Sequence, residues 1–162
     1  MKGLCLLFAL CLLPGTAQAR AVVAVPHTRP LTLECMADAA QEYAVPLAAL
    51  VGILAVEGGT VGEAQRNANG SWDLGSFQVN TCNLNELAAQ GYAPDAILRD
   101  GCVNASAAAR ILRREYLRAG DLWTAIGGYH SKTPQLHAAY VARVRKHLVR
   151  LGNAIWPGGV QP

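Results

Sequence analysis

The residue of this sequence best suited to acid–base chemistry is Glu57. It ends a strongly apolar stretch that begins after Pro46, and Gly58 and Gly59 follow it directly. An apolar setting disfavours the charged carboxylate, so we expect the pKa of Glu57 to rise toward neutrality, where a carboxyl group can protonate a leaving-group oxygen. The two glycines let backbone or ligand approach closely. Glu57 is therefore the candidate catalytic acid; the alternative is an ordinary solvated glutamate at a helix end.

The segment that follows, residues 60–80, has a different character. Small and polar residues dominate it, and Asn69-Gly70 is a strong hairpin-turn signal because both positions tolerate a positive φ. We therefore expect a short β-ribbon there, in a chain that is otherwise mostly helical.

The same segment carries a long spaced pattern. From Asn67 to Asn80 it reads N-A-N-G-S-W-D-L-G-S-F-Q-V-N. Together with Glu57 upstream, this strip resembles the active-site strip of the lysozyme superfamily, in which a catalytic glutamate ends a helix and a hairpin carries N-x-D/N-G-S-x-D-x-G-x-x-Q-I/V-N. The chain matches every fixed position of that pattern, namely Asn67, Asn69, Gly70, Ser71, Asp73, Gly75, Gln78 and Asn80.

Two further strips narrow the resemblance to the small lytic transglycosylases associated with conjugation, type IV secretion and pilus systems, over roughly residues 33–148. Residues 35–50 look like their opening helix pair, and residues 128–134, G-Y-H-S-K-T-P, look like their closing substrate-side motif. Two positions depart from the family. His130 stands where the commoner motif has Asn, and Gly58 stands where many relatives have Ser.

The resemblance implies a mainly α, lysozyme-like domain with a small β-hairpin flanking a glycan cleft. It also implies peptidoglycan glycan strands as the substrate, Glu57 as the catalytic residue, and neither a metal nor a cofactor. The side chains expected to bind substrate are those of Gln78, Asn80, Tyr129, Asp73, Trp72 and His130.

Each of these side chains could bind sugar, and each also has an alternative structural role. The amides of Gln78 and Asn80 suit N-acetyl and hydroxyl groups, and Tyr129 offers an aromatic face with a polar tip. Trp72 is expected to stack on a sugar ring. The alternatives are hairpin hydrogen bonds and core packing for the first three, a cover over the domain edge for Trp72, and a structural or solvent-facing role for His130.

Asp73 leaves two reactions open. In transglycosylation Glu57 works alone and the C6 hydroxyl of muramic acid closes a 1,6-anhydro ring, so that Asp73 mainly braces the hairpin. In a hydrolytic muramidase Asp73 is the second carboxylate, acting as nucleophile or electrostatic stabiliser. The similar proteins that carry this aspartate are regarded as transglycosylases, which favours the first reaction. A third alternative is a non-catalytic wall-binding assembly module, against which Glu57 beside Gln78 and Tyr129 argues.

The start of the chain has the features of a secretory signal over residues 1–19. Lys2 supplies a positive charge, residues 4–13 are apolar, and Ala17-Gln18-Ala19 is a small-x-small cleavage site. The apolar run is shorter than the roughly 20 residues that span a bilayer. We therefore expect an exported, periplasmic protein without stable membrane insertion after cleavage.

Export would determine which cysteines remain and whether they can form a disulfide. Removal of the signal would leave Cys35, Cys82 and Cys102, an odd number in an oxidising compartment, so one disulfide and one free thiol are expected. The resemblance implies the pair Cys35–Cys102. The scattered histidines and cysteines have no zinc-type spacing.

The remaining pattern sets domain limits. We expect a flexible lead at residues 20–30, one domain at 31–152 and a disordered tail at 153–162, because prolines and glycines mark both ends. Helical spacing predicts helices from Thr32 and from Pro46 to Glu57. Further helices are predicted at about 83–90, 104–118, 121–129 and 134–151.

The charge pattern says little about nucleic acid. The formal net charge of +3 is too small and too dispersed to indicate nucleic-acid binding. One helix nevertheless carries arginines three and four positions apart, along one side. Such a stripe is either a solvated face or a surface for anionic wall polymer or a secretion or conjugation subunit; its members are Arg110, Arg113, Arg114 and Arg118.

Overall fold

The computed structural model describes residues 27–155 and shows a mainly α domain with one small antiparallel sheet. The predicted signal at 1–19 lies outside the described residues. In chain order the elements are α1 (Leu33–Glu42), α2 (Leu47–Glu57), β1 (Ala64–Arg66), β2 (Trp72–Leu74), β3 (Val79–Asn80), the 3-10 helix η1 (Thr81–Asn83), α3 (Leu84–Ala88), α4 (Pro94–Arg99), α5 (Gly101–Ala119), α6 (Leu122–His130) and α7 (Pro134–Ile155). The predicted fold class is confirmed. Within 27–155, no helix is both long and apolar enough to cross a membrane.

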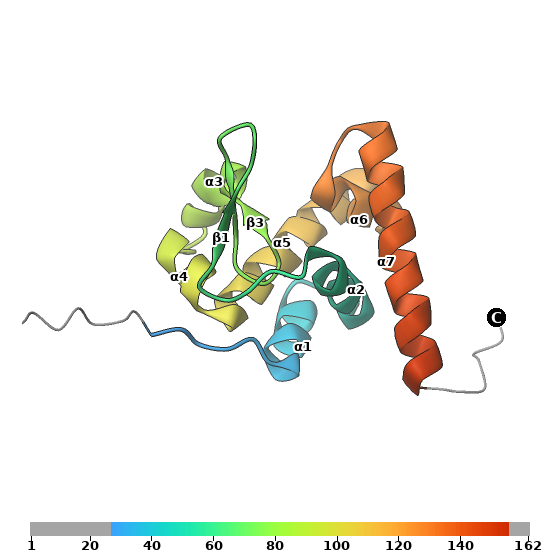
Figure 1. Ribbon diagram of the computed structural model, residues 1–162, viewed down its shortest axis with the longest axis horizontal. Helices are drawn as coiled ribbons and strands as arrows, with labels where there is room; N and C mark the ends of the chain where they lie inside the picture. The colour runs from blue at the N-terminus through green and yellow to red at the C-terminus, as the bar shows by residue number, and fades with distance from the viewer. Residues whose placement is uncertain (1–26, 156–162) are drawn as a thin grey trace, which may run out of the picture.

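Helix α5 is the centre of the domain, and α1 and α6 pack against it, while α7 packs against α6 and α2 (Figure 1). The middle of α5 is rich in alanine, and Ala105, Ala107 and Ala108 are fully buried. Small side chains allow neighbouring helices to come close. Leu50 and Ile53 of α2 are also fully buried, so the apolar stretch before Glu57 is a core helix.

Helix ends follow capping chemistry. The Thr32 side chain accepts a hydrogen bond at the start of α1, and the Asp100 side chain accepts two at the start of α5. α5 therefore begins at Gly101, three residues before the predicted start. The prediction missed α4, whose signals were Pro94 in its first turn and an Asp95–Arg99 pair four residues apart.

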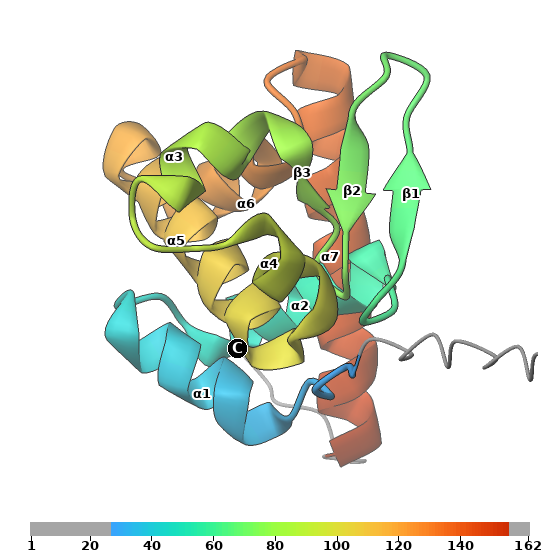
Figure 2. The same ribbon diagram turned by 90° about the vertical axis from the view of Figure 1, so that its left-hand side faces the viewer.

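The predicted β-ribbon is a three-stranded sheet in the order β1-β2-β3, drawn in green in Figure 2. Asp73 on the middle strand pairs with Gln65 on one side and Asn80 on the other. The turn between β1 and β2 is closed by hydrogen bonds from Asn67 N–H to Ser71 O (2.8 Å) and from Gly70 N–H to Asn67 O (3.0 Å). The Asn-Gly signal therefore located the turn correctly.

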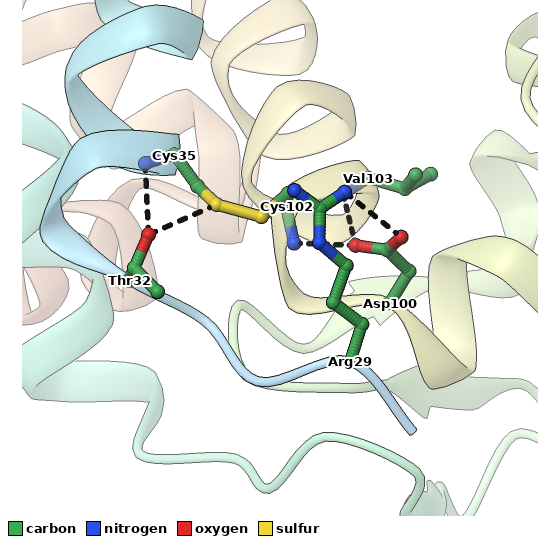
Figure 3. The surroundings of a disulfide bond; sticks show 6 residues. All are labelled: Arg29, Thr32, Cys35, Asp100, Cys102 and Val103. Atoms are coloured by element: carbon green, nitrogen blue, oxygen red, sulfur yellow. Dashed lines mark hydrogen bonds and ion pairs between the residues drawn. A yellow bond between two sulfur atoms is a disulfide. The ribbon is translucent and has the colours of Figure 1, made fainter. Parts of the chain in front are cut away.

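A disulfide joins the start of α1 to the start of α5 (Figure 3). It pairs Cys35 with Cys102, as the resemblance implied, with the two Cα atoms 5.0 Å apart, and Cys82 is exposed and outside it. Arg29, in the described part of the lead expected to be flexible at 20–30, is anchored beside this bond. Arg29 N–H donates to Arg99 O at 2.9 Å, and its guanidinium lies 3.4 Å from Asp100.

At the C-terminal side, the helical domain extends beyond the predicted end at residue 152. Helix α7 continues to Ile155, three residues into the segment expected to be a disordered tail. Residues 156–162 lie outside the described part of the chain.

Candidate active site

Glu57 is the last residue of α2. The loop that joins β2 to β3, residues 75–78, packs directly against the turn after Glu57, and we call it the hairpin loop. Gly58 adopts a left-handed conformation (φ 59°) that ends the helix, a conformation that glycine adopts without strain. The Gly59 N–H then donates to Ser76 O at 3.1 Å. A Cβ at position 59 would lie 2.1 Å from Gly75 O, so only glycine permits this approach. The glycine pair thus brings the hairpin loop beside the candidate acid.

The Glu57 carboxyl group is half-buried and is held by a tyrosine of α7. The Tyr140 hydroxyl, on a side chain that is almost fully buried, donates a hydrogen bond of 2.5 Å to Glu57 Oε1. Burial raises the pKa of Glu57 above its ordinary value; the Tyr140 hydrogen bond and the Arg143 charge partly oppose this rise, and Asp73 adds to it. A carboxyl group in this state can give up a proton and take it back.

His130 and Arg143 surround the Tyr140 ring. The His130 ring stacks parallel on it, with centroids 4.6 Å apart and an interplanar angle of 4°, and the Arg143 guanidinium carbon lies 5.4 Å from its centroid. Burial and the Arg143 charge lower the pKa of His130, while Asp73 opposes that shift. His130 is therefore close to the candidate acid, on the face of the tyrosine that holds it.

Tyr129 links α6 to the hairpin loop. Its hydroxyl donates to Phe77 O at 2.9 Å, and burial together with the charges of Glu57 and Asp73 raises the pKa of Tyr129 well above its ordinary value. The structure therefore brings Glu57, Asp73, Tyr129 and His130 into one electrostatic cluster. Three elements supply these residues: α2, the hairpin and α6.

Asp73 and Asn80 brace the hairpin. Asp73 Oδ2 accepts from Asn67 Nδ2 (2.9 Å), and its Oδ1 accepts from Asn80 Nδ2 (2.7 Å). Asn80 Nδ2 also donates to Ser71 Oγ at 2.9 Å, and its Oδ1 accepts from the Cys82 N–H at 2.9 Å. Both amide atoms of Asn80 are thus engaged within the hairpin, which corresponds to the structural alternative for this residue.

Gln78 and Trp72 take different positions. Gln78 has a positive φ of 49°, unusual for a residue other than glycine, and its Nε2 donates to Gly75 O at 2.8 Å beside Gly59. Trp72 is 42% exposed. Successive strand residues point to opposite faces, so Trp72 shares a face with Leu74 and not with Asp73. The stacking of Trp72 on a sugar ring stays a prediction.

Two residues around the acid were missed by the sequence analysis. Tyr140 and Arg143 both lie on the helix predicted at 134–151, and Tyr140 precedes the buried Val144 by one helical turn. That spacing indicated a buried side chain. It could not indicate the partner, because Glu57 is 83 positions away in the chain.

Asn104 was also missed, and it fixes the hairpin loop to the helices. It is 1% exposed; its Oδ1 accepts from the Phe77 N–H at 2.8 Å, and its Nδ2 donates to Leu74 O and Ile97 O, both at 2.9 Å. A buried amide with all partners satisfied holds its neighbours in one arrangement. A polar residue in an alanine-rich helix was the available signal.

Comparison with known proteins agrees with this geometry. Invasion protein IagB of Salmonella typhimurium is 32% identical over 79 residues, which are 49% of this chain and 48% of the relative. Invasion protein IagB of Salmonella typhi matches to the same extent. The chain thus spans about half the length of the curated relatives it matches. Residues 34–142, from α1 into α7, match the Transglycosylase SLT domain. The chain belongs to the transglycosylase SLT domain family.

Proposed function

We propose that this protein is a peptidoglycan lytic transglycosylase that cleaves the β-1,4 bond between N-acetylmuramic acid and N-acetylglucosamine. The observation that carries the proposal is the contrast between its two carboxylates. Glu57 is half-buried, has a raised pKa and accepts one hydrogen bond from Tyr140. Both oxygens of Asp73 accept hydrogen bonds from hairpin amides. One carboxyl group is therefore poised for proton transfer, and the other is engaged in holding the hairpin.

The reaction needs only that one group. Protonated Glu57 gives its proton to the glycosidic oxygen, and the bond from that oxygen to C1 of the muramyl residue breaks. The resulting Glu57 carboxylate then takes the proton of the C6 hydroxyl while O6 bonds to C1, which closes the 1,6-anhydro ring and restores the acid. A tethered, well-oriented hydroxyl can reach an effective molarity of about 10⁵ M, far above the roughly 55 M of water.

The neighbours of Glu57 support both halves of this cycle. Burial favours its protonated form before bond cleavage. The Tyr140 hydrogen bond and the Arg143 charge favour the carboxylate that exists between the two proton transfers. The substrate's own N-acetyl group would stabilise the cation at C1, so no second protein carboxylate is required.

Mass analysis of the products released from purified peptidoglycan tests the proposal. A transglycosylase yields muropeptides that end in 1,6-anhydro-muramic acid and are lighter by one water than hydrolytic products. Products with a free reducing end would instead establish a hydrolytic muramidase. Absence of any cleavage by the wild type would favour the non-catalytic wall-binding module.

We also propose that the protein acts after export to the periplasm, where it opens the wall locally during assembly of a secretion or conjugation apparatus. The supporting observations are the signal pattern at residues 1–19 and the similarity to a relative named an invasion protein. N-terminal sequencing of the protein recovered from a periplasmic fraction should begin at Arg20. Recovery of the uncleaved chain in the cytoplasm would contradict export.

A further inference from the structure

A cavity of about 330 Å³ lies on α5, and none of its lining residues belongs to the cluster around Glu57. We call it the arginine groove. Figure 2 shows α1, α3 and α5 on the left of the domain, and β1, β2 and α7 on the right. The groove is formed by Tyr43 at the end of α1, Glu86 of α3, and Arg110, Arg113, Arg114, Leu117 and Arg118 of α5.

Two of the four arginines are already paired. Arg114 lies 2.5 Å from Glu86 and 3.2 Å from Glu115, and its Nη2 donates to Asn83 Oδ1 at 3.0 Å. Arg118 lies 3.3 Å from Glu115. These pairs engage Arg114 and Arg118 with Glu86 and Glu115, and they leave the four arginines with two positive charges in excess of the two carboxylates.

The excess charge belongs to Arg110 and Arg113. Arg110 Nε is buried and has no hydrogen-bond partner among the described residues. Arg113 makes one long hydrogen bond of 3.4 Å to Ala44 O, and its guanidinium carbon lies 5.6 Å from the Tyr116 ring centroid. Neither Arg110 nor Arg113 has a carboxylate partner among the described residues, so carboxylates of a bound segment would neutralise both guanidinium groups. Arginine forks bind carboxylates with two parallel hydrogen bonds.

An apolar side chain lies among these charges. Leu117 is 68% exposed and lines the same groove. A phosphate-bearing or other uniformly anionic polymer offers nothing apolar to cover Leu117. A peptide that carries both carboxylates and an apolar side chain complements all of these features. From Arg110 to Arg118 the helix rises about 12 Å, the length of three or four residues of an extended peptide.

We propose that the arginine groove binds an acidic segment of a partner protein, with carboxylates on Arg110 and Arg113 and an apolar side chain on Leu117. This inference is independent of the proposed reaction, because the groove contains no residue used there. It describes a site through which a partner can recruit the domain while the surroundings of Glu57 remain free.

Titration of the ¹⁵N-labelled protein with synthetic peptides tests this proposal. The probe is a heptapeptide of alternating glutamate and leucine, and the comparison peptide has serine in place of each leucine. We expect saturable amide shifts in α5 around Arg110, Arg113 and Leu117, with weaker binding of the serine peptide. Inorganic polyphosphate serves as the polymer probe. Equal binding of the two peptides, tighter binding of polyphosphate, or no saturable shift with the leucine peptide would each overturn the proposal.

Charge reversal identifies the groove as the site. Arg110→Glu and Arg113→Glu should each weaken binding of the leucine peptide by at least about fivefold, the order expected for loss of one solvated ion pair plus new repulsion. Arg150→Glu, an exposed position on α7, is the control with the same charge change. Leu117→Ser tests the apolar contact at an exposed position, where folding is not at risk. Equal weakening by Arg150→Glu would show non-specific attraction, and cleavage of glycan strands should stay unchanged in all four variants.

Discussion

Two glutamates of this domain occupy enclosed positions in opposite electrostatic surroundings. Glu115 in the second half of α5 is 4% exposed and lies within ion-pair distance of three cations. Glu57 at the end of α2 is half-buried and accepts a hydrogen bond from the neutral Tyr140 hydroxyl. The three cations around Glu115 are Arg114, Arg118 and Lys132.

The difference separates a structural carboxylate from a reactive one. Direct cationic partners make a carboxylate a link between elements; Lys132 joins the loop after α6 to α5 in this way. Burial instead raises the pKa of Glu57, and the hydrogen bond from Tyr140 opposes that rise only in part. The same residue type therefore links elements in one region and is suited to proton transfer in the other.

The largest expected effect is that of Glu57→Gln on cleavage. The amide keeps the shape and can accept the Tyr140 hydrogen bond, but it cannot donate a proton to the leaving oxygen. We expect glycan cleavage to fall by about 100- to 10,000-fold with binding retained. Turnover of purified peptidoglycan measures the loss, and Glu63→Gln, at an exposed position, is the control. Retention of more than about a tenth of wild-type turnover would show that Glu57 is not the acid.

Glu57→Gln should also stabilise the fold. The folded-state pKa of Glu57 is raised above its ordinary value of 4.5, so the folded protein binds more protons than the unfolded chain above that pH. The free energy of unfolding of the wild type therefore falls as pH rises from about 4.5 through the folded-state pKa. Glu57→Gln removes this loss. Its melting temperature should exceed that of the wild type near pH 7 and converge with it below about pH 4.

Glu115→Gln should have the opposite effect on stability. It removes the counter-charge of three cations, and breaking a buried ion pair costs about 3–5 kcal/mol when the remaining charge is buried. Here the Arg118 and Lys132 side chains are 62% and 65% exposed, so water compensates part of that cost. We expect a loss of roughly 1–3 kcal/mol of unfolding free energy. Denaturant titration measures it, and an unchanged stability would contradict the structural role of Glu115.

Tyr140→Phe tests how the Glu57 carboxyl group is held, because it removes the only direct hydrogen-bond donor to Glu57 among the described residues. Without this hydrogen bond the carboxylate is less stable, so the pKa of Glu57 rises further and the protonated form persists to higher pH. We expect the basic limb of the kcat/KM profile to move to higher pH, and the maximum rate to fall by about tenfold for loss of one charge-assisted hydrogen bond. Tyr116→Phe is the matched control. A shift of the basic limb to lower pH would show that the Tyr140 hydrogen bond does not stabilise the Glu57 carboxylate.

The fold class and the half-buried position of Glu57 could be predicted from the sequence because their signals are local. Glu57 follows an apolar run, and the hairpin turn is specified by Asn69-Gly70. Tyr140 could not be assigned to Glu57, since only tertiary folding joins residues 83 positions apart. Asn80 shows the limit of a motif: the pattern marks the residue, but only the structure shows that its amide is engaged within the hairpin.

The anchored Arg29 and the helix α4 were missed for related reasons. Arg29 lies among prolines in a segment without periodicity, and its partner Asp100 is 71 positions away. α4 has six residues, fewer than two helical turns, so hydrophobic spacing could not reveal it. Short elements are held by their tertiary contacts more than by their own propensity.

The smallest expected effect is that of Asp73→Asn, and it distinguishes the two reactions. Removing the Asp73 charge takes away the last and weakest contribution to the raised pKa of Glu57, so the basic limb of the pH profile should move slightly to lower pH, opposite to Tyr140→Phe. The new amide cannot accept from both Asn67 and Asn80, so the hairpin loses about one hydrogen bond, roughly 1 kcal/mol. Activity should therefore decline only modestly, and the products should still carry the anhydro ring. A control that removes the brace without the charge, Asn67→Ala, should lower activity to a similar extent without moving the pH profile. A collapse of rate in Asp73→Asn alone, together with reducing-end products from the wild type, would place Asp73 in the chemistry and make the two carboxylates partners.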